Sequence, residues 1–423
     1  MPEFDKLTPP TGHIVQVGQD GDVVTPDDPV VPYIEGDGIG PEIWEATREV
    51  LDAAVEAAYG GKRRVAWFEI FAGHAAIEKY GEGHVLPEDT FAAIRHFKVA
   101  IKGPLTTPVG GGIRSCNVAL RQRLDLYANV RPVQFIPGLP SPLKNPERVD
   151  LVIFRENTED VYAGIEWADG TPEAREIIEL INTKWMPGCG LSDAAAIGIK
   201  PITQRASERL VRAAIQFALD HGRKSVTLVH KGNIMKFTEG GFLTWGKELA
   251  EREFGDRVIT LEECEAAHFG QVPAGKVLVK ERIADAMFQD LILHPEEHDV
   301  VATTNLNGDY LSDAAAALIG GLGFAAGANL GDGLALFEAV HGTAPDIACQ
   351  DVANPSSLIL TGRELLRYLG WDEAAALVWE AIRSVVGKGY VTADVACWLP
   401  NVVPLSTQEF KNALLAEIRN PGS

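Results

Sequence analysis

The stretch "VVPYIEGDGIGPEIWEATREVLDAAVEAAY" (residues 30–59) passes from a β-branched run through a glycine-rich turn into a long amphipathic pattern. Pro41 suits the first turn of a helix, where its missing N–H costs nothing, so we predict a helix from this residue onward. The turn "EGDGIGPE" (residues 35–42) lacks both the G-x-G-x-x-G spacing and the later acidic residue of a Rossmann site. We interpret it as a tight packing turn, although its backbone amides could still touch a cofactor.

The same order of strand, turn and helix recurs along the chain. Apolar runs such as "VAIKGP", "LVIFRE" and "SVTLVHK" alternate with helical patterns such as "GGFLTWGKELAEREF" and "DYLSDAAAALI". This alternation predicts an α/β protein with substantial parallel pairing in its sheet. Glycines, prolines and polar insertions break the rhythm over residues 163–204, where we expect an appended arm, and helical patterns return after residue 360.

The amino-acid composition limits which kinds of partner the protein can bind and where in the cell we expect it. The 423 residues carry a formal net charge of −21, which argues against nucleic acid and anionic membranes because both would be repelled. The five cysteines are scattered without a CxxC pair, so neither a disulfide framework nor a zinc site is indicated. With no leader-like start and no apolar run of membrane length, we expect a soluble, cytoplasmic protein.

The segment "RSCNVALRQRLDLYANVRP" (residues 114–132) contains four arginines, a serine and an asparagine among aliphatic residues. It is too apolar for a solvated loop and too cationic for an ordinary core. In a strongly acidic protein, an anionic substrate needs such a local cationic pocket. The segment therefore predicts an anion site.

Four further motifs each allow a structural and a functional interpretation. Lys231 ends the apolar strand "SVTLV", as either a solvated strand end or an ammonium placed to exchange a proton. Asp309 and Asp313 share one face of a predicted helix, where they match the helix dipole or bind a divalent cation. Tyr162 is a packed aromatic residue or a reactive phenol, and Asp346 is a helix cap or an acceptor for ribose hydroxyls.

Together these stretches resemble the bacterial isocitrate dehydrogenases of the isocitrate/isopropylmalate (β-decarboxylating) dehydrogenase family. The likeness covers about residues 30 to 410 and rests on five segments in the family's order: "GPLTTPVGGGIRSCNVALRQRLDLYANVRP", "LVIFRENTEDVYAGIEW", "VTLVHKGNIMKFTEG", "NLNGDYLSDA" and "HGTAP". The resemblance implies a family-specific α/β fold that is not Rossmann. It implies a large domain of residues 1–126 with 320–423, a small domain of residues 127–159 with 205–319, and a clasp-like arm of residues 160–204.

The resemblance also implies an activity: the oxidative decarboxylation of isocitrate in the tricarboxylic acid cycle, by a homodimer with shared active sites. It assigns the three substrate carboxylates to arginines, with a serine and an asparagine on the carboxylate that isopropylmalate lacks: Arg121, Arg131, Arg155, Ser115 and Asn117. Guanidinium groups suit this role because they bind carboxylates bidentately and stay charged in a cleft.

For the reaction itself, the resemblance assigns Lys231 as the base for the hydroxyl proton and Tyr162 as the proton donor to the enol carbon. Magnesium or manganese is expected on Asp309 and Asp313 together with Asp285, the last from the partner subunit.

The resemblance places the nicotinamide cofactor on Thr106, His341, Gly342, Asp346, Ile347 and Asn354. NADP-dependent relatives carry a lysine and a tyrosine directly after "HGTAP" and a further tyrosine and arginine near the C-terminus. Here Asp346, Ile347, Ala393 and Cys397 stand at those positions. An aspartate would accept ribose hydroxyls and repel a phosphate, so we expect NAD. The alternatives are NADP, or 3-isopropylmalate, homoisocitrate or tartrate as substrate, or a non-catalytic binding subunit.

Overall fold

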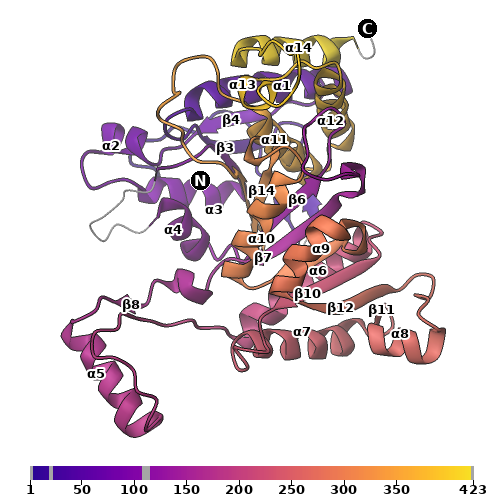
Figure 1. The fold of residues 1–423 in the computed structure, drawn as a ribbon. Helices are drawn as coiled ribbons and strands as arrows, with labels where there is room; N and C mark the ends of the chain where they lie inside the picture. Colours follow the sequence, from indigo (N-terminus) through magenta and orange to yellow (C-terminus); the bar gives the residue numbers. More distant parts are fainter. Residues whose placement is uncertain (1–2, 19–21, 107–114, 421–423) are drawn as a thin grey trace.

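One continuous sheet of eleven strands forms the centre of the computed structural model, which describes residues 3–18, 22–106 and 115–420 (Figure 1). Across the sheet, the strands lie in the order β11 (Val258–Thr260), β12 (Val277–Ile283), β10 (Ser225–His230), β13 (Val300–Thr303), β7 (Asp150–Glu156), β6 (Ala128–Gln134), β14 (Ala326–Gly331), β15 (Leu334–Ala339), β5 (Val99–Lys102), β3 (Val30–Ile34) and β4 (Ala66–Glu69).

The two ends of this sheet are parallel and its middle is antiparallel. The five strands from β11 to β7 run parallel, as do the four from β15 to β4. The junctions β7–β6, β6–β14 and β14–β15 are antiparallel. The predicted α/β class is therefore confirmed. The proposed boundary between the two domains lies between β6 and β14. Because these strands pair with each other, backbone hydrogen bonds of the sheet join the two proposed domains.

Helix α1 (Gly40–Tyr59) begins one residue before Pro41, as the sequence predicts. The turn before it is tightly packed: a Cβ at Gly38 (φ 62°) would come within 2.1 Å of the carbonyl oxygen of Thr343. The backbone N–H of Ile39 donates to that same oxygen at 2.9 Å. The predicted packing turn is thus confirmed, and it fixes the "HGTAP" loop against the start of α1.

Helices cover both faces of the sheet. Helix α10 (Asn305–Ala317) packs over β6 and β7 on one face, while α6 (Gln204–Asp220) and α11 (Ser356–Tyr368) pack over neighbouring strands on the other. Helix α1 packs against α11, α12 (Asp372–Gly387) and α14 (Thr407–Arg419). The other helices are α2 (His74–Tyr80), α3 (Glu88–Phe97), α4 (Cys116–Arg123), α7 (Glu239–Phe254), α8 (Leu261–His268), α9 (Ala284–Leu293) and α13 (Ala393–Ala396), with short helices η1 (Pro146–Arg148), η2 (Asp160–Ala163), η4 (Pro295–Glu297) and η5 (Leu322–Phe324).

An arm extends away from the body of the molecule (Figure 1). It contains the two-stranded ribbon of β8 (Glu166–Trp167) and β9 (Ile197–Gly198) and the helix α5 (Pro172–Leu180), which continues as the π-helical turn η3 (Ile181–Trp185). At its tip Trp185 and Met186 are 60% and 61% exposed. A separate ribbon near the N-terminus pairs β1 (Gln16–Val17) with β2 (Val23–Val24).

Among the described helices, none combines the length and the apolar character needed to span a membrane.

Candidate active site

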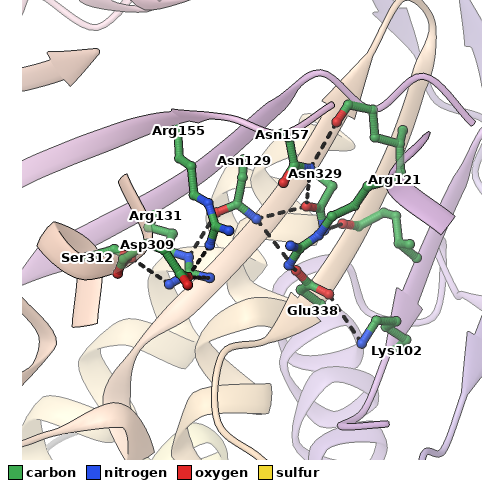
Figure 2. Close-up of polar contacts among 12 residues, drawn as sticks. Lys102, Arg121, Asn129, Arg131, Arg155, Asn157, Asp309, Ser312, Asn329 and Glu338 are labelled. Atoms are coloured by element: carbon green, nitrogen blue, oxygen red, sulfur yellow. Dashed lines mark hydrogen bonds and ion pairs between the residues drawn. The ribbon is translucent and has the colours of Figure 1, made fainter. Parts of the chain in front are cut away.

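Two buried arginines project from the central strands toward α10. Asn129 and Arg131 lie two residues apart on β6 and so share one face of the sheet, and Asn129 is paired in register with Arg155 on β7. Arg131 is 7% exposed and Arg155 2%. Because α10 covers this face, both guanidinium groups meet the polar side of that helix (Figure 2).

The acids of α10 pair with these arginines. Asp309 accepts from both the guanidinium group of Arg155 and the phenol of Tyr162. Arg131 donates to Asp313 at 3.0 Å and to the hydroxyl of Ser312 at 2.5 Å. The predicted spacing of the two aspartates on one helix face thus places both against the arginines.

Additional bonds hold the arginines in place. The Nε of Arg131 donates to the side chain of Asn129 at 2.8 Å, and the Nε of Arg155 donates to that of Asn305 at 2.8 Å. The guanidinium group of Arg155 also lies over the ring of Tyr162, at 4.9 Å from its centroid. Each planar group is therefore oriented by two elements of the fold.

The crowding of positive charge shifts pKa values in this cluster. Burial, followed by repulsion from Arg121 and Arg131, lowers the pKa of Arg155 to about 10. Burial and the bond to Asp309 raise the pKa of Tyr162 to about 12. Burial alone would raise the pKa of Asp309, but Arg155, Tyr162 and the other arginines outweigh it and lower that pKa. Guanidinium groups that repel one another in a buried site favour a bound anion.

A second polar group adjoins the first, and the sequence analysis predicted only one of its members, Arg121. Arg121 on α4 donates to Glu338 on β15 at 2.5 Å, and the ammonium of Lys102 on β5 lies 3.2 Å from the same carboxylate. Lys102 is 1% exposed and Glu338 4%. Asn129 and Asn157 both donate to the side chain of Asn329, which ties this group to the arginine cluster (Figure 2).

The two polar residues expected to select the substrate lie at the start of α4. Ser115 is the residue preceding the helix, and Asn117 lies in its first turn. The side-chain oxygen of Asn117 is buried and has no hydrogen-bond partner among the described residues, which leaves an acceptor for a ligand donor or a bridging water. Arg114, the first residue of the cationic segment, lies outside the described residues.

Lys231 and Asp285 pair with each other within this chain, at 2.5 Å. Lys231 follows β10 and Asp285 lies in the first turn of α9. The Lys231 backbone N–H donates to the fully buried Glu239 at 2.9 Å. Glu239 also accepts from Thr304 at 2.8 Å, next to the start of α10. The described contacts thus anchor Lys231 in the fold without joining its ammonium to the arginine cluster.

The residues expected to bind the cofactor occupy loops near the turn before α1. Thr106 donates its backbone N–H at 2.8 Å to Asp37, a buried residue of that turn. The Nε2 of His341, beside the exposed Gly342, is buried and has no hydrogen-bond partner in residues 3–18, 22–106 and 115–420. Asn354 donates to Asp394 at 3.0 Å, next to Ala393 at the start of α13. Asp346 is exposed and Ile347 is partly buried in the loop after "HGTAP".

The donor set for a divalent cation is incomplete in a single chain. Two carboxylates one helical turn apart, Asp309 and Asp313, are hard oxygen donors of the kind that Mg²⁺ and Mn²⁺ prefer. In the described part of the chain, no three histidine, cysteine, aspartate or glutamate side chains gather closely enough to hold a metal. The pair therefore fits such a cation if one further acid comes from a second chain.

Comparison with known proteins decides the family. The model of the isocitrate/isopropylmalate dehydrogenase family matches residues 30–414. The chain belongs to the isocitrate/isopropylmalate dehydrogenase family. Two similar relatives of this family are both named isocitrate dehydrogenase [NADP]. The protein from Archaeoglobus fulgidus is 50% identical over 99% of this chain and 100% of the relative, and the protein from Haloferax volcanii is 51% identical over 98% and 99%.

A solved structure of the same family supports the fold. The crystal structure of isocitrate dehydrogenase from Methylococcus capsulatus superposes with a TM-score of 0.76 at 40% identity, covering 92% of this chain and 99% of that one. The predicted family fold is confirmed.

The prediction of NAD, and of kinship with the NAD-preferring members, is wrong on this evidence. Relatives about 50% identical over nearly the whole chain are named as NADP enzymes. The prediction relied on one loop acid and on positions near the C-terminus. In the structure Asp346, Ala393 and Cys397 are all exposed. A solvated carboxylate in a surface loop is screened and can turn away, so it does not by itself exclude a phosphate.

Proposed function

We propose that this protein catalyses the NADP-linked oxidative decarboxylation of isocitrate to 2-oxoglutarate and carbon dioxide, with a divalent cation. The observation that carries the proposal is the cluster of three arginines that are paired with carboxylates: Arg131 with Asp313, Arg155 with Asp309, and the adjoining, partly buried Arg121 with Glu338. The names of the similar relatives support the same substrate and cofactor.

The arginines match a substrate with several carboxylates. In the structure their guanidinium groups are neutralised by Asp309, Asp313 and Glu338. A trianion would supply that compensation instead and would release the α10 carboxylates for a cation. Ser115 and Asn117 would meet the carboxylate that is absent from 3-isopropylmalate, and an alkyl chain in its place would offer no hydrogen bond to the buried side-chain oxygen of Asn117.

The residues have distinct roles in the proposed reaction. Lys231 removes the proton from the C2 hydroxyl group, and bound NADP would supply the acceptor for the hydride from C2. Tyr162, whose phenol is protonated at neutral pH, delivers a proton to C3 after carbon dioxide leaves. A divalent cation on Asp309 and Asp313, together with Asp285 of the partner subunit, would withdraw electrons from the C2 oxygen and so stabilise the developing enolate.

A homodimer completes this site. Because Lys231 and Asp285 pair away from the arginine cluster, the proposal requires that these two residues act in the site of a partner subunit. The exposed Trp185 and Met186 of the arm offer apolar surface for such a partner. All five cysteines are free, which accords with the reducing cytoplasm.

The substrate proposal is tested with a panel of 2-hydroxy acids and with variants at Ser115. Wild type should oxidise isocitrate and reject 3-isopropylmalate, while Ser115→Leu should lose isocitrate turnover. Val118→Leu, three residues further along and within α4, is the matched control and should keep the preference of wild type. A wild type that prefers 3-isopropylmalate would overturn the substrate assignment.

The cofactor proposal is tested separately, by comparing kcat/KM for NADP and NAD with saturating isocitrate. We expect NADP to be preferred. If NADP is bound, Asp346→Asn should raise kcat/KM for NADP, because a negative charge near the 2′-phosphate is removed. A clear preference of wild type for NAD would reject NADP and leave the substrate proposal intact.

A further inference from the structure

A cavity of about 640 Å³ lies on the face of the sheet opposite to the arginine cluster. Its floor is apolar and comes from the same central strands that carry the polar cluster: Val130 and Pro132 on β6, Phe154 on β7, Ala328 on β14 and Phe337 on β15. These residues alternate along their strands with Arg131, Arg155, Asn329 and Glu338, and successive side chains of a strand point to opposite faces. The cavity and the candidate active site therefore share one layer of backbone.

The packing of the helices explains the cavity. On this face α6 packs over β7 and β13, and α11 packs over β14 and β15. The cavity lies between the two helices, above β6, where Phe217 of α6 and Leu360 of α11 form opposite walls. The ring of Phe217 lies 5.3 Å from that of Phe154, and the ring of Phe337 lies 5.7 Å from that of Tyr368. Aromatic rings thus line both sides of an apolar floor.

The lining of the cavity also includes charged side chains. Arg363 and Arg367 of α11 share the single carboxylate of Glu364, at 2.9 Å and 3.3 Å. Arg223 pairs with Asp150 at 2.8 Å. The guanidinium group of Arg363 lies over the ring of Trp379, and its buried Nε has no hydrogen-bond partner within the part of the chain that the structure describes. Three guanidinium groups therefore share two paired carboxylates, and one buried donor is unused.

The charges also limit the ligand. Asp372, exposed at the start of α12, lines the cavity as well, so the full set of acids equals the three arginines in number. Because the acidic side chains of the lining equal the arginines in number, a polyanion would gain little electrostatic attraction, and Asp372 would repel it. A single negative charge could be met by the unused Arg363 donor while an attached ring system fills the apolar space.

We propose that this cavity is a second ligand site, separate from the candidate active site, which binds a small aromatic monoanion. The rings of the ligand pack between Phe217 and Leu360 above β6, and its acidic group bonds to Arg363. The volume falls within the range of about 300 to 1,000 Å³ that is typical of small-molecule sites. This proposal does not depend on the reaction that the protein catalyses.

The probe for this site is 8-anilinonaphthalene-1-sulfonate, an aromatic monoanion that fluoresces strongly in apolar surroundings. Titration of the folded full chain should show one saturable site per chain, and neither isocitrate nor NADP should displace the probe. Ala328→Leu, which fills part of the cavity, and Arg363→Gln, which removes the charge, should each weaken binding by about 10-fold or more. Arg383→Gln, in a surface pair with Glu380 outside the cavity lining, is the matched control and should bind as wild type does.

Circular dichroism and urea unfolding verify that each variant is folded. If Ala328→Leu does not fold, the comparison of Arg363→Gln with Arg383→Gln decides the question alone. Displacement of the probe by NADP, absence of a saturable site, or equal affinity in Arg363→Gln and Arg383→Gln would each overturn the proposal.

Discussion

Replacing Glu338 with glutamine should destabilise the protein strongly, because this carboxylate neutralises one buried cation, Lys102, and one partly buried cation, Arg121. Its partners are Lys102 at 3.2 Å and Arg121 at 2.5 Å, and both it and Lys102 are almost fully buried. Glutamine preserves the shape but removes the charge. Lys102 would then lose its paired carboxylate and keep the carbonyl oxygen of Gly103 as an acceptor, at 3.0 Å.

The size of the effect follows from this geometry. Breaking a buried ion pair by removing one partner costs about 3 to 5 kcal/mol, because the remaining charge is left uncompensated. Burial already lowers the pKa of Lys102, so this lysine can release its proton in the variant and bring the loss toward the lower end of that range. We therefore expect a loss of about 3 kcal/mol or more in the free energy of unfolding at neutral pH.

The assay is urea unfolding of Glu338→Gln and wild type at equal chain concentration. Glu380→Gln, which breaks the exposed pair with Arg383, is the control and should cost no more than about 1 kcal/mol. Burial alone would raise the pKa of Glu338, but Arg121 and Lys102 outweigh it and hold that pKa far below its usual value.

Because the pKa of Glu338 is lower in the folded protein than in the unfolded chain, its charge contributes stability. This contribution is fully present above the pKa of the unfolded chain, about 4.3, and is lost as the pH falls toward the pKa of the folded protein. The gap between wild type and Glu338→Gln should therefore be widest at neutral pH and narrow below about pH 4. If the loss at neutral pH is no larger than that of Glu380→Gln, the Glu338 charge does not stabilise Lys102 and Arg121 as inferred.

The candidate active site and its supports allow three further tests. Tyr162→Phe should lower overall turnover by about 100-fold or more while the reduction of oxalosuccinate to isocitrate is largely retained; equal loss of both reactions would remove the proton-donor role. Glu239→Gln weakens the anchor of the Lys231 backbone and should lower kcat with little change in KM, whereas an unchanged kcat would show that this anchor does not position Lys231. Burial raises the pKa of Glu159 in the folded protein to about 7, whereas its pKa in the unfolded chain is about 4.3. The protein therefore loses stability as the pH rises from about 4.3 to about 7, and this loss is complete above about pH 7. Glu159→Gln should therefore raise the urea midpoint at pH 8 and leave it nearly unchanged at pH 4, and equal effects at both pH values would contradict this.

The local parts of the fold could be predicted from the sequence, and the long-range parts could not. The start of α1 at Pro41, the alternation of strands and helices, and the shared helix face of Asp309 and Asp313 all follow from neighbouring residues. The antiparallel junction of β6 with β14 pairs segments about two hundred positions apart, and no local pattern specifies such a pairing.

The same distinction applies to the candidate site. Lys102 ends the apolar run "VAIK" much as Lys231 follows "SVTLVH". The pattern that marked Lys231 as a candidate site residue could therefore also have marked Lys102. Glu338 lies inside the buried strand "LALFEA", where an acid needs a cation partner, but only the tertiary structure shows that Arg121 and Lys102 supply it. The cofactor was predicted wrongly because the prediction rested on a few side chains of a surface loop, and the sequence does not show their exposure or their surroundings.

Oxidative decarboxylation of isocitrate is tested most directly by the product balance of wild type with isocitrate, NADP and magnesium. We expect equal amounts of NADPH, 2-oxoglutarate and carbon dioxide, with no products after a chelator and full recovery when magnesium or manganese is added. Reduced cofactor without carbon dioxide, or turnover that the chelator does not affect, would contradict the proposed reaction.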